Sequence, residues 1–206
     1  MKLLFALPHY YKAADGAYGS LSPQPERRIS ALIESIGAVH QLFGDRQCEI
    51  DIVRRTTVSA NTGSQHQIKV VVCTTGDDHL LPRVSIPSGL YCHQQTQAQA
   101  NLLGYECHQV LKDALGQYDY YCYMEDDLVI HDALFFEKLN QWNQQTELLD
   151  VLQPNRFEIS VRGLFKRVYV DGDIRPAATE ALQDLSVNPS LSLSLLGLPL
   201  VFRRPY

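Results

Sequence analysis

The sequence has no long apolar run. No stretch approaches the roughly 20 consecutive apolar residues of a membrane-spanning helix. Near the N-terminus, Pro8 ends the short apolar LLFAL well before it reaches the length of a secretory signal. We therefore expect a soluble, cytoplasmic protein without a transmembrane segment, which leaves room for peripheral membrane contact.

Basic residues and cysteine motifs are also scarce. Lys and Arg number 18 against 23 Asp and Glu, for a net charge of -5. Nucleic-acid binding needs concentrated Lys and Arg, so nucleic acid is not expected as a partner. An anionic substrate is still compatible with this charge if a metal neutralises it.

The 5 cysteines are odd in number and lack CxxC spacing, which favours buried free thiols over disulfides or a zinc site.

The length and composition are those of a globular protein. With 206 residues, 45% of them hydrophobic, the chain is long enough for one well-buried domain. Alternating strand and helix patterns predict this domain over residues 1–175. Residues 176–206 are predicted to be a poorly ordered tail, in which a short helical pattern over 176–185 precedes a Leu- and Ser-rich stretch.

Several runs have the pattern of strands. Residues 3–7 form an apolar run that Pro8 ends, typical of a central strand buried on both faces. The runs 48–58 and 67–74 are joined by a link too short for a crossover helix, so we expect them to pair as a hairpin. Further strands are predicted over 118–124, 148–153 and 157–170, with a turn at 171–173.

Three segments have helical spacing of apolar residues. Helices are predicted over 25–43 and 99–115, ended by Gly44 and Gly116, and a third from the N-cap Asp132. The inner face of the third helix is expected to hold Phe135, Phe136, Leu139 and Trp142. Because the second helix leads directly into a strand, we expect an α/β fold with a Rossmann-like mixed, mostly parallel sheet flanked by helices.

The loop after the first strand is a candidate ligand-binding segment. In open α/β sheets, ligands bind at the carboxyl ends of the strands. The candidate contacts are Pro8, His9, Tyr10, Tyr11 and Lys12. An ordinary surface loop with exposed tyrosines is the alternative.

Two further polar segments are candidates for ligand contact. The cluster Asp77-Asp78-His79 ends the run 67–74, and could contact a nucleotide or a metal; a simple Gly-Asp-Asp turn is the alternative. Arg27 and Arg28 lie in the first turn of the first helix, where a cation opposes the helix dipole, so they are candidates for binding an anion; solvated arginines are the alternative.

Three consecutive carboxylates, Glu125, Asp126 and Asp127, interrupt the aromatic run YDYYCYMEDDLVI. Adjacent anions beside a core are unstable unless a cation or a proton compensates them. In an extended backbone Glu125 and Asp127 would point to one side, and their hard oxygens suit Mn²⁺ or Mg²⁺ with phosphate oxygens completing the shell. An exposed acidic turn is the alternative interpretation.

The acidic triplet at the end of an aromatic strand resembles the DxD-type motif of GT-A glycosyltransferases, which use nucleotide-diphosphate sugars. The N-terminal FALPHYY, the segment YMEDDLVIHD, and VLQPNRFE with VYVDGD beyond it support the resemblance over about residues 1–173. It implies a nucleotide-sugar donor and an acceptor (glycan, lipid or protein) that the sequence does not specify. It also implies that Asp127 binds the metal directly, Glu125 through water, and Asp126 lies near the ribose.

A sugar transfer that inverts the anomeric carbon needs a base near the acceptor hydroxyl. Glu158 is the candidate base, and Arg156 a candidate phosphate contact. Two alternatives stay open. One is a metal-dependent phosphohydrolase that combines the triplet with Asp77, Asp78 and His79; the other is a non-catalytic sugar- or nucleotide-binding relative, since no histidine follows His131 to supply a late metal ligand.

Overall fold

The computed structural model describes the chain apart from residues 15–17, 61–65, 146–153, 160–166, 171–200 and 204–206. The described residues belong to two compact units, one containing Met1–Val129 and the other Ile130–Arg204. The predicted domain boundary after residue 175 lies outside the described residues and stays a prediction, as do the strand at 148–153, the turn at 171–173 and the helix at 176–185.

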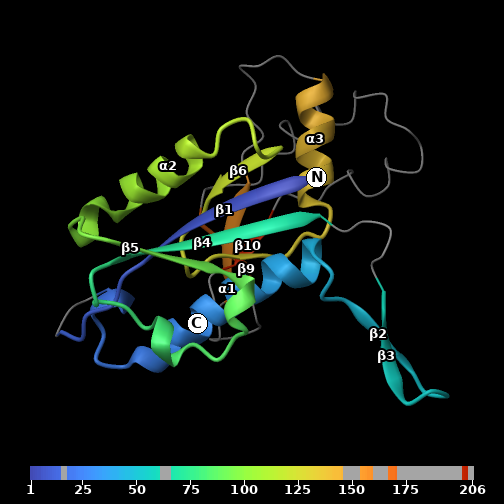
Figure 1. Ribbon diagram of the computed structural model, residues 1–206, viewed down its shortest axis with the longest axis horizontal. Coiled ribbons are helices and arrows are strands. Elements are labelled where there is room, and N and C mark those ends of the chain that lie inside the picture. The colour runs from blue at the N-terminus through green and yellow to red at the C-terminus, as the bar shows by residue number, and fades with distance from the viewer. Residues whose placement is uncertain (15–17, 61–65, 146–153, 160–166, 171–200, 204–206) are drawn as a thin grey trace. The chain divides into compact units, whose positions relative to one another are not determined.

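The first unit is built on a four-stranded parallel sheet (Figure 1). Its strands are β1 (Lys2–His9), β4 (Gln67–Thr75), β5 (Cys92–Thr96) and β6 (Tyr120–Tyr123). They lie in the order β5-β4-β1-β6, so β1 and β4 are the inner strands. The sheet is flanked by helices, which confirms the predicted α/β class and is consistent with a Rossmann-like fold in general.

The first strand is longer than predicted. β1 continues through Pro8 to His9, and Pro8 pairs with Cys73 of β4. Proline removes one backbone donor, but the pairing of β1 with β6 ends at Ala6 and Tyr123, with one more bond from Met124 N–H to the Ala6 carbonyl. The missing donor therefore falls where the ladder with β6 has ended, and His9 is carried to the carboxyl end of the sheet.

The predicted hairpin between 48–58 and 67–74 is wrong. Instead, β2 (Cys48–Asp51) pairs antiparallel with β3 (Thr56–Ser59), and Arg55 in the turn between them has a φ of 52°. The run 67–75 is β4, which pairs in parallel with β1 and β5. Its continuous apolar centre suits a strand buried on both faces, and α1 supplies the crossover that a parallel pair requires.

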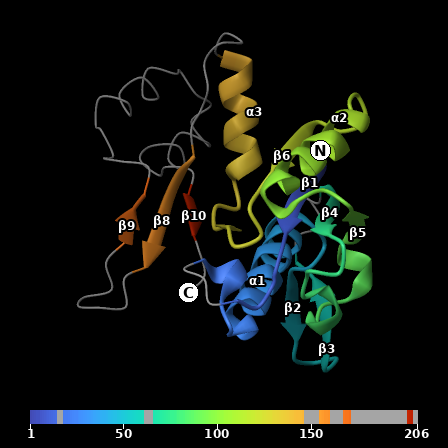
Figure 2. The same cartoon turned by 90° about the vertical axis from the view of Figure 1, so that its left-hand side faces the viewer.

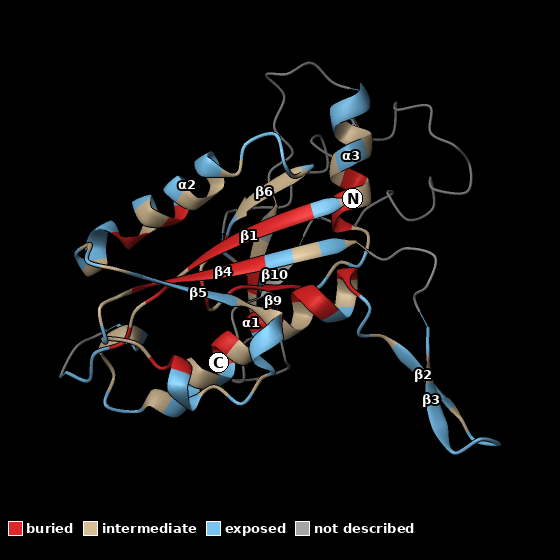
Figure 3. Ribbon diagram, viewed as in Figure 1, coloured by how far each residue is buried: buried red, intermediate tan, exposed pale blue. Residues whose placement is uncertain are grey.

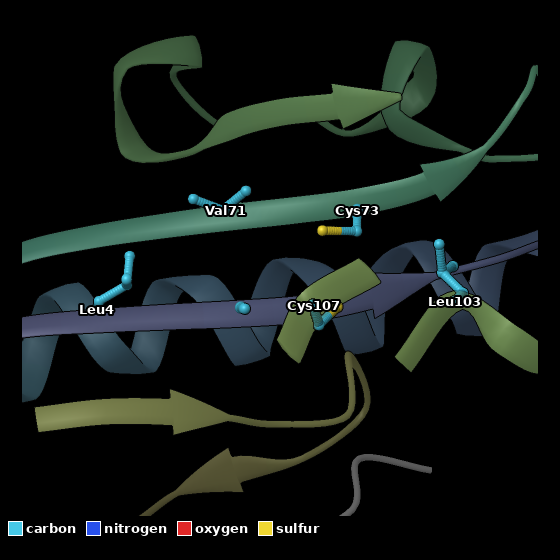
Figure 4. Close-up of a cluster of buried hydrophobic side chains, with 6 residues drawn as sticks. Leu4, Val71, Cys73, Leu103 and Cys107 are labelled. Atoms are coloured by element: carbon cyan, nitrogen blue, oxygen red, sulfur yellow. The ribbon is translucent and has the colours of Figure 1, made fainter. Parts of the chain in front are cut away.

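Helices α1 (Pro25–Phe43) and α2 (Leu103–Asp113) lie on opposite sides of this sheet (Figure 1). A core cluster joins α2 to one face of β1 and β4, with labelled side chains shown in Figure 4. Its buried members are Leu4, Ala6, Val71, Cys73, Leu103 and Cys107. The apolar residues Val110, Leu111 and Ala114 also pack against this cluster, so the helical spacing of apolar residues over 99–115 marks the face that meets the sheet.

α1 follows its prediction at both ends, with Pro25 in the first turn and Gly44 at the C-cap. Its buried residues recur at helical spacing: Ala31, Leu32, Ser35, Ile36, Val39, His40 and Phe43. α2 begins four residues later than predicted, because Ala100–Leu102 form a 3₁₀ turn ahead of it. The other 3₁₀ turns are Gly19–Leu21, Leu81–Arg83 and Ser88–Leu90. Figure 3 shows the buried faces of β1, β4 and both helices.

The buried histidine of α1 gives the unit a pH dependence. Burial lowers the pKa of His40 below its ordinary value of 6.5, against the hydrogen bond from Nε2 to the Leu90 carbonyl, which raises it. The unfolded chain therefore takes up a proton before the folded chain does. Stability conferred by neutral His40 is lost as the pH falls through 6.5 toward the lower folded-state pKa.

We expect His40→Gln to reduce this acid sensitivity, because glutamine keeps a donor for Leu90 but does not titrate. The measurement is the denaturation midpoint at about pH 7 and about pH 5. The matched control is His108→Gln, on the exposed side of α2. An equal loss of stability in wild type and His40→Gln between the two pH values would contradict this assignment.

The strand before the acidic triplet is shorter than the predicted range 118–124. β6 is an edge strand of the described sheet, and three of its residues are half-buried while Tyr123 is exposed. The Tyr121 hydroxyl donates to the Ala114 carbonyl and accepts from the backbone N–H groups of Gln117 and Tyr118. The aromatic run thus packs the end of α2 against the sheet edge instead of filling a central strand.

The described part of the second unit holds α3 (Phe135–Gln145) and short strands (Figure 2). A sheet is formed by four of these strands, in the order β7 (Val129–Ile130), β10 (Val201–Arg203), β8 (Asn155–Ile159) and β9 (Arg167–Tyr169).

On α3, Phe135 and Phe136 are buried as predicted, while Leu139 and Trp142 are half-buried. Asp132 accepts a bond from Leu134 N–H and pairs with buried Lys138 at 2.6 Å. β10 lies within residues 176–206, which were predicted to be a poorly ordered tail.

All five cysteines are free, although only Cys73 and Cys107 are buried and Cys48 and Cys92 are exposed. Burial raises the pKa of Cys122 to about 12. The hydrogen bond to Cys73, together with burial, raises the pKa of Cys107 as well. Neither thiol therefore supplies a thiolate nucleophile at neutral pH.

Among the described helices, none is both long and apolar enough to cross a bilayer.

Candidate functional site

The carboxyl ends of β1 and β6 meet at the point where the strand order reverses. From β1 the chain moves to β4 and then to β5, and returns through α2 to β6 on the other side of β1. In open α/β sheets this switch point is where ligands bind, outside the carboxyl ends of the strands. The acidic triplet follows β6 directly, so it lies at this point.

The triplet lies in a turn and not in an extended segment. Leu128 N–H donates to the Glu125 carbonyl at 3.1 Å, with Asp126 and Asp127 as the central residues. The expected alternation of side chains along a strand is therefore wrong for these residues. Asp126 is buried, at 1% exposure, whereas Glu125 and Asp127 remain partly exposed.

Asp126 is held by two partners from distant parts of the chain. One carboxylate oxygen accepts from Nδ1 of buried His9 at 2.5 Å, and the other accepts from the Arg28 guanidinium. The second terminal nitrogen of Arg28 contacts Asp127 at 3.2 Å. Arg28 therefore bridges both aspartates of the turn, and supplies the positive charge that adjacent carboxylates require.

The hydrogen bonds of His9 define which ring nitrogen carries the proton. Leu80 N–H donates to His9 Nε2 at 3.1 Å, and a backbone N–H can only donate. Nε2 is therefore the unprotonated acceptor, and Nδ1–H donates to Asp126. Both nitrogens are used and the ring has 0% exposure, so His9 positions the acidic turn. This role differs from the ligand contact that was predicted for His9. A ligand could contact the ring only if one of its two hydrogen bonds were broken.

Of the two candidate arginines, Arg28 is the one brought to the triplet. Arg27 is exposed, while the Arg28 side chain is only 17% exposed. Arg28 precedes Leu32 and Ile36 at intervals of four, which places it on the buried stripe of α1. That register is the signal in the sequence that distinguishes the two arginines. The cost of a cation in the first turn is offset by the two aspartates that it meets.

The segment after β4 lies beside His9 on its other flank. Asp77 is exposed and accepts from Gln95 at 3.0 Å; Asp78 pairs with Lys12 at 3.3 Å on the surface. Burial lowers the pKa of His79, and His93, whose ring lies 4.9 Å away, lowers it further. β1 separates this segment from the acidic turn. Since adjacent strands are about 4.8 Å apart, the ends of β4 and β6 are about 10 Å apart.

The remaining predicted residues fall into two groups. Pro8 and Tyr10 are half-buried at the carboxyl end of β1, and Tyr10 packs against the α2 cluster. Arg156 and Glu158 lie on β8 in the second unit and are both half-buried. The base and phosphate-contact roles of these two residues stay predictions.

The acidic turn offers an incomplete set of metal ligands. In the described part of the chain, no group of three His, Cys, Asp or Glu side chains is arranged to hold a metal ion. Mg²⁺ and Mn²⁺ sites that also bind phosphate commonly use one or two protein carboxylates. Glu125 and Asp127 fit that number and chemistry, while buried Asp126 is committed to His9 and Arg28.

Two buried polar atoms close to these strand ends lack a hydrogen-bond partner in the described structure. They are Nε of Arg28 and Oγ1 of Thr75, the last residue of β4. Buried polar groups are normally paired, so unpaired ones call for an explanation such as a ligand or water. The arginine and the threonine thus offer hydrogen-bonding capacity to a polar ligand.

Comparison with protein-family models, with curated proteins and with solved structures gave no match to this chain.

Proposed function

We propose that the chain is a glycosyltransferase of the GT-A type that binds a nucleotide-diphosphate sugar and a divalent metal at the acidic turn. The observation that carries this proposal is the position of the turn, at the carboxyl ends of β1 and β6 where the strand order reverses. A compensated acidic turn at this position is suited to an anionic ligand bound together with a cation.

Asp127 and Glu125 would hold the Mn²⁺ or Mg²⁺ ion. When bound, the metal would neutralise the diphosphate leaving group as a Lewis acid. Asp126 acts differently, because its burial and its bonds to His9 and Arg28 fix the turn that presents the other two carboxylates. The carboxylate of Asp126 is already hydrogen-bonded, so we assign the proposed ribose contact to the backbone near Asp126.

Arg28 would be a phosphate contact in this proposal. Its terminal nitrogens bridge Asp126 and Asp127, and its buried Nε has no partner within the described residues. Guanidinium groups bind phosphate oxygens strongly, so Arg28 is suited to a diphosphate lying against the turn. Of the two arginines predicted to bind an anion, Arg28 is the one that contacts the acidic turn, and this contact supports the proposed role.

The phosphohydrolase alternative is less well supported by the geometry. A two-metal hydrolase holds its metals about 4 Å apart. The segment Asp77–His79 and the acidic turn follow strands separated by β1, about 10 Å apart. Asp77 and Asp78 are also engaged with Gln95 and Lys12.

Asp127→Ala tests the proposal directly. We expect UDP or GDP to bind the wild-type chain only when Mn²⁺ is present, and the variant to bind about 100-fold more weakly or worse, since even outer partners of metal ligands contribute 10- to 100-fold. Isothermal titration calorimetry with and without Mn²⁺ measures this. Asp113→Ala, an exposed carboxylate on α2, is the matched control and should bind like wild type.

Metal-independent nucleotide binding, or unchanged binding in Asp127→Ala, would contradict the proposal. Turnover separates a transferase from a relative that only binds sugar nucleotides. Metal-dependent hydrolysis of the donor by wild type, lost in Asp127→Ala, would show that the chain is catalytic.

A further inference from the structure

The hairpin of β2 and β3 exposes aliphatic side chains at its tip. Ile50 is 78% exposed, Ile52 83% and Val53 93%. Figure 1 shows the hairpin projecting from the first unit, and Figure 3 shows that most of it is exposed. Contiguous exposed apolar side chains on a soluble protein usually mark a surface that binds something.

The hairpin has little internal support. β2 and β3 pair only with each other in the described sheet topology, and every residue of both strands is exposed or half-buried. An isolated two-stranded hairpin is marginally stable in water. Contact with another surface would therefore stabilise it as well as cover its aliphatic residues.

Charge is unevenly distributed over the hairpin. Cross-strand pairs put Cys48 opposite Ser59 and Ile50 opposite Thr57, so one face carries no charge. The tip continues with Ile52 and Val53, followed at once by Arg54 and Arg55. The acidic residues Glu49 and Asp51 belong to the opposite face.

The two arginines are presented at the surface beside the aliphatic pair. The Arg54 side chain is 77% exposed, although its Nε lies 3.7 Å from Asp51, whose carboxylate also accepts from Arg54 N–H at 2.9 Å. Arg55 is exposed and has a φ of 52° in the turn. Asp51 thus fixes the turn from one side while both guanidinium groups remain accessible.

We propose that the tip, residues 52–55, binds the surface of a membrane that contains anionic lipids. Ile52 and Val53 would enter the boundary between headgroups and acyl chains, and Arg54 and Arg55 would contact lipid phosphates and carboxylates. The net charge of -5 on the whole chain opposes binding to such a surface only weakly, because salt screens charges beyond about 8 Å. This inference is independent of the proposed enzymatic function.

A second copy of the chain is a less suitable occupant. Pairing two β2 edges would bring Glu49 and Asp51 of the copies close together, and like charges on neighbouring strands are destabilising. Ile52 and Val53 also lie in the turn, beyond the last paired residues Asp51 and Thr56, where strand pairing would not cover them.

Vesicle flotation with the full chain tests the proposal. We expect binding to vesicles of equal parts phosphatidylcholine and phosphatidylserine, weaker binding to phosphatidylcholine alone, and loss of the difference at high salt. The double variant Ile52→Asn/Val53→Asn should lower the partition coefficient about tenfold or more. Arg54→Gln/Arg55→Asn should abolish the preference for phosphatidylserine; asparagine is chosen at 55 because it tolerates positive φ.

The matched controls change exposed residues away from the tip. Leu115→Asn removes an aliphatic side chain that is 65% exposed, and Arg83→Gln removes a surface arginine whose side chain is 51% exposed. Both should bind vesicles like wild type. The proposal is overturned if wild type floats with neither vesicle, or if the tip variants bind as well as wild type. It is also overturned if light scattering shows a dimer that the tip variants lose while vesicle binding is absent.

Discussion

Replacing Asp126 by alanine is expected to lower the free energy of unfolding of the first unit by about 3–5 kcal/mol. The carboxylate is 1% exposed and accepts from both His9 and Arg28. Its removal leaves the Arg28 guanidinium beside a cavity with only the 3.2 Å contact to Asp127. Uncompensated buried charge is among the most destabilising consequences of a single substitution.

Urea denaturation of the full chain, followed by circular dichroism, measures the effect. Asp126→Asn serves as a second variant, because it keeps an acceptor for one of the two donors and should lose less stability. Asp113→Ala on the exposed side of α2 is the control, expected to change stability by less than about 0.5 kcal/mol. A loss below about 1 kcal/mol in Asp126→Ala would mean that the network does not stabilise the fold.

His9→Leu is expected to lower the free energy of unfolding by about 2–4 kcal/mol, even though leucine is apolar and of similar size. Leu80 N–H and one oxygen of Asp126 would each lose a hydrogen bond in a buried environment. Leucine restores neither bond, so the cost comes from unsatisfied polar groups and not from a cavity.

A double-mutant cycle separates this cause from simple repacking. If His9 acts through Asp126, the loss in His9→Leu/Asp126→Ala should be smaller than the sum of the single losses by about 1 kcal/mol or more. His108→Leu on the exposed side of α2 is the control and should be near neutral. Additive losses within about 0.3 kcal/mol would show that the two residues stabilise the unit independently.

The elements with a complete local pattern could be predicted from the sequence. α1 has an apolar stripe over its whole length, with Pro25 at the start and Gly44 at the end. The inner strands β1 and β4 have continuous apolar centres that only a doubly covered strand explains. In these segments the burial pattern repeats within a few residues, and no distant contact is needed to specify it.

The pairing of the strands could not be predicted from local sequence patterns. Residues 48–58 have the pattern of one strand, but the chain turns at 52–55 and its two halves pair with each other. The turn depends on Arg55 adopting a positive φ, and arginine gives no local signal for that conformation. One partner of β4 is β1, more than sixty positions earlier in the chain, and no local pattern specifies this pairing.

The candidate site was predictable in location but not in detail. The aromatic run and the three carboxylates indicate a strand end with an acidic segment, and this is where the structure has it. Which carboxylate is buried depends on the turn at Glu125–Leu128 and on Arg28, which lies 98 positions away from Asp126. The first-turn criterion does not separate Arg27 from Arg28, and only the apolar stripe of α1 indicates that Arg28 is the one that reaches the acidic turn.

The network around Asp126 also constrains the order in which the unit assembles. His9 and Asp126 are 117 positions apart, so the chain must close a long loop before their bond forms. Until β6 docks beside β1, a chain emerging from the ribosome has His9 and Arg28 but no acidic turn to meet them. The edge of the sheet that carries the acidic turn is therefore completed late, and a chain that stops before residue 120 contains most of the sheet but none of the acidic turn.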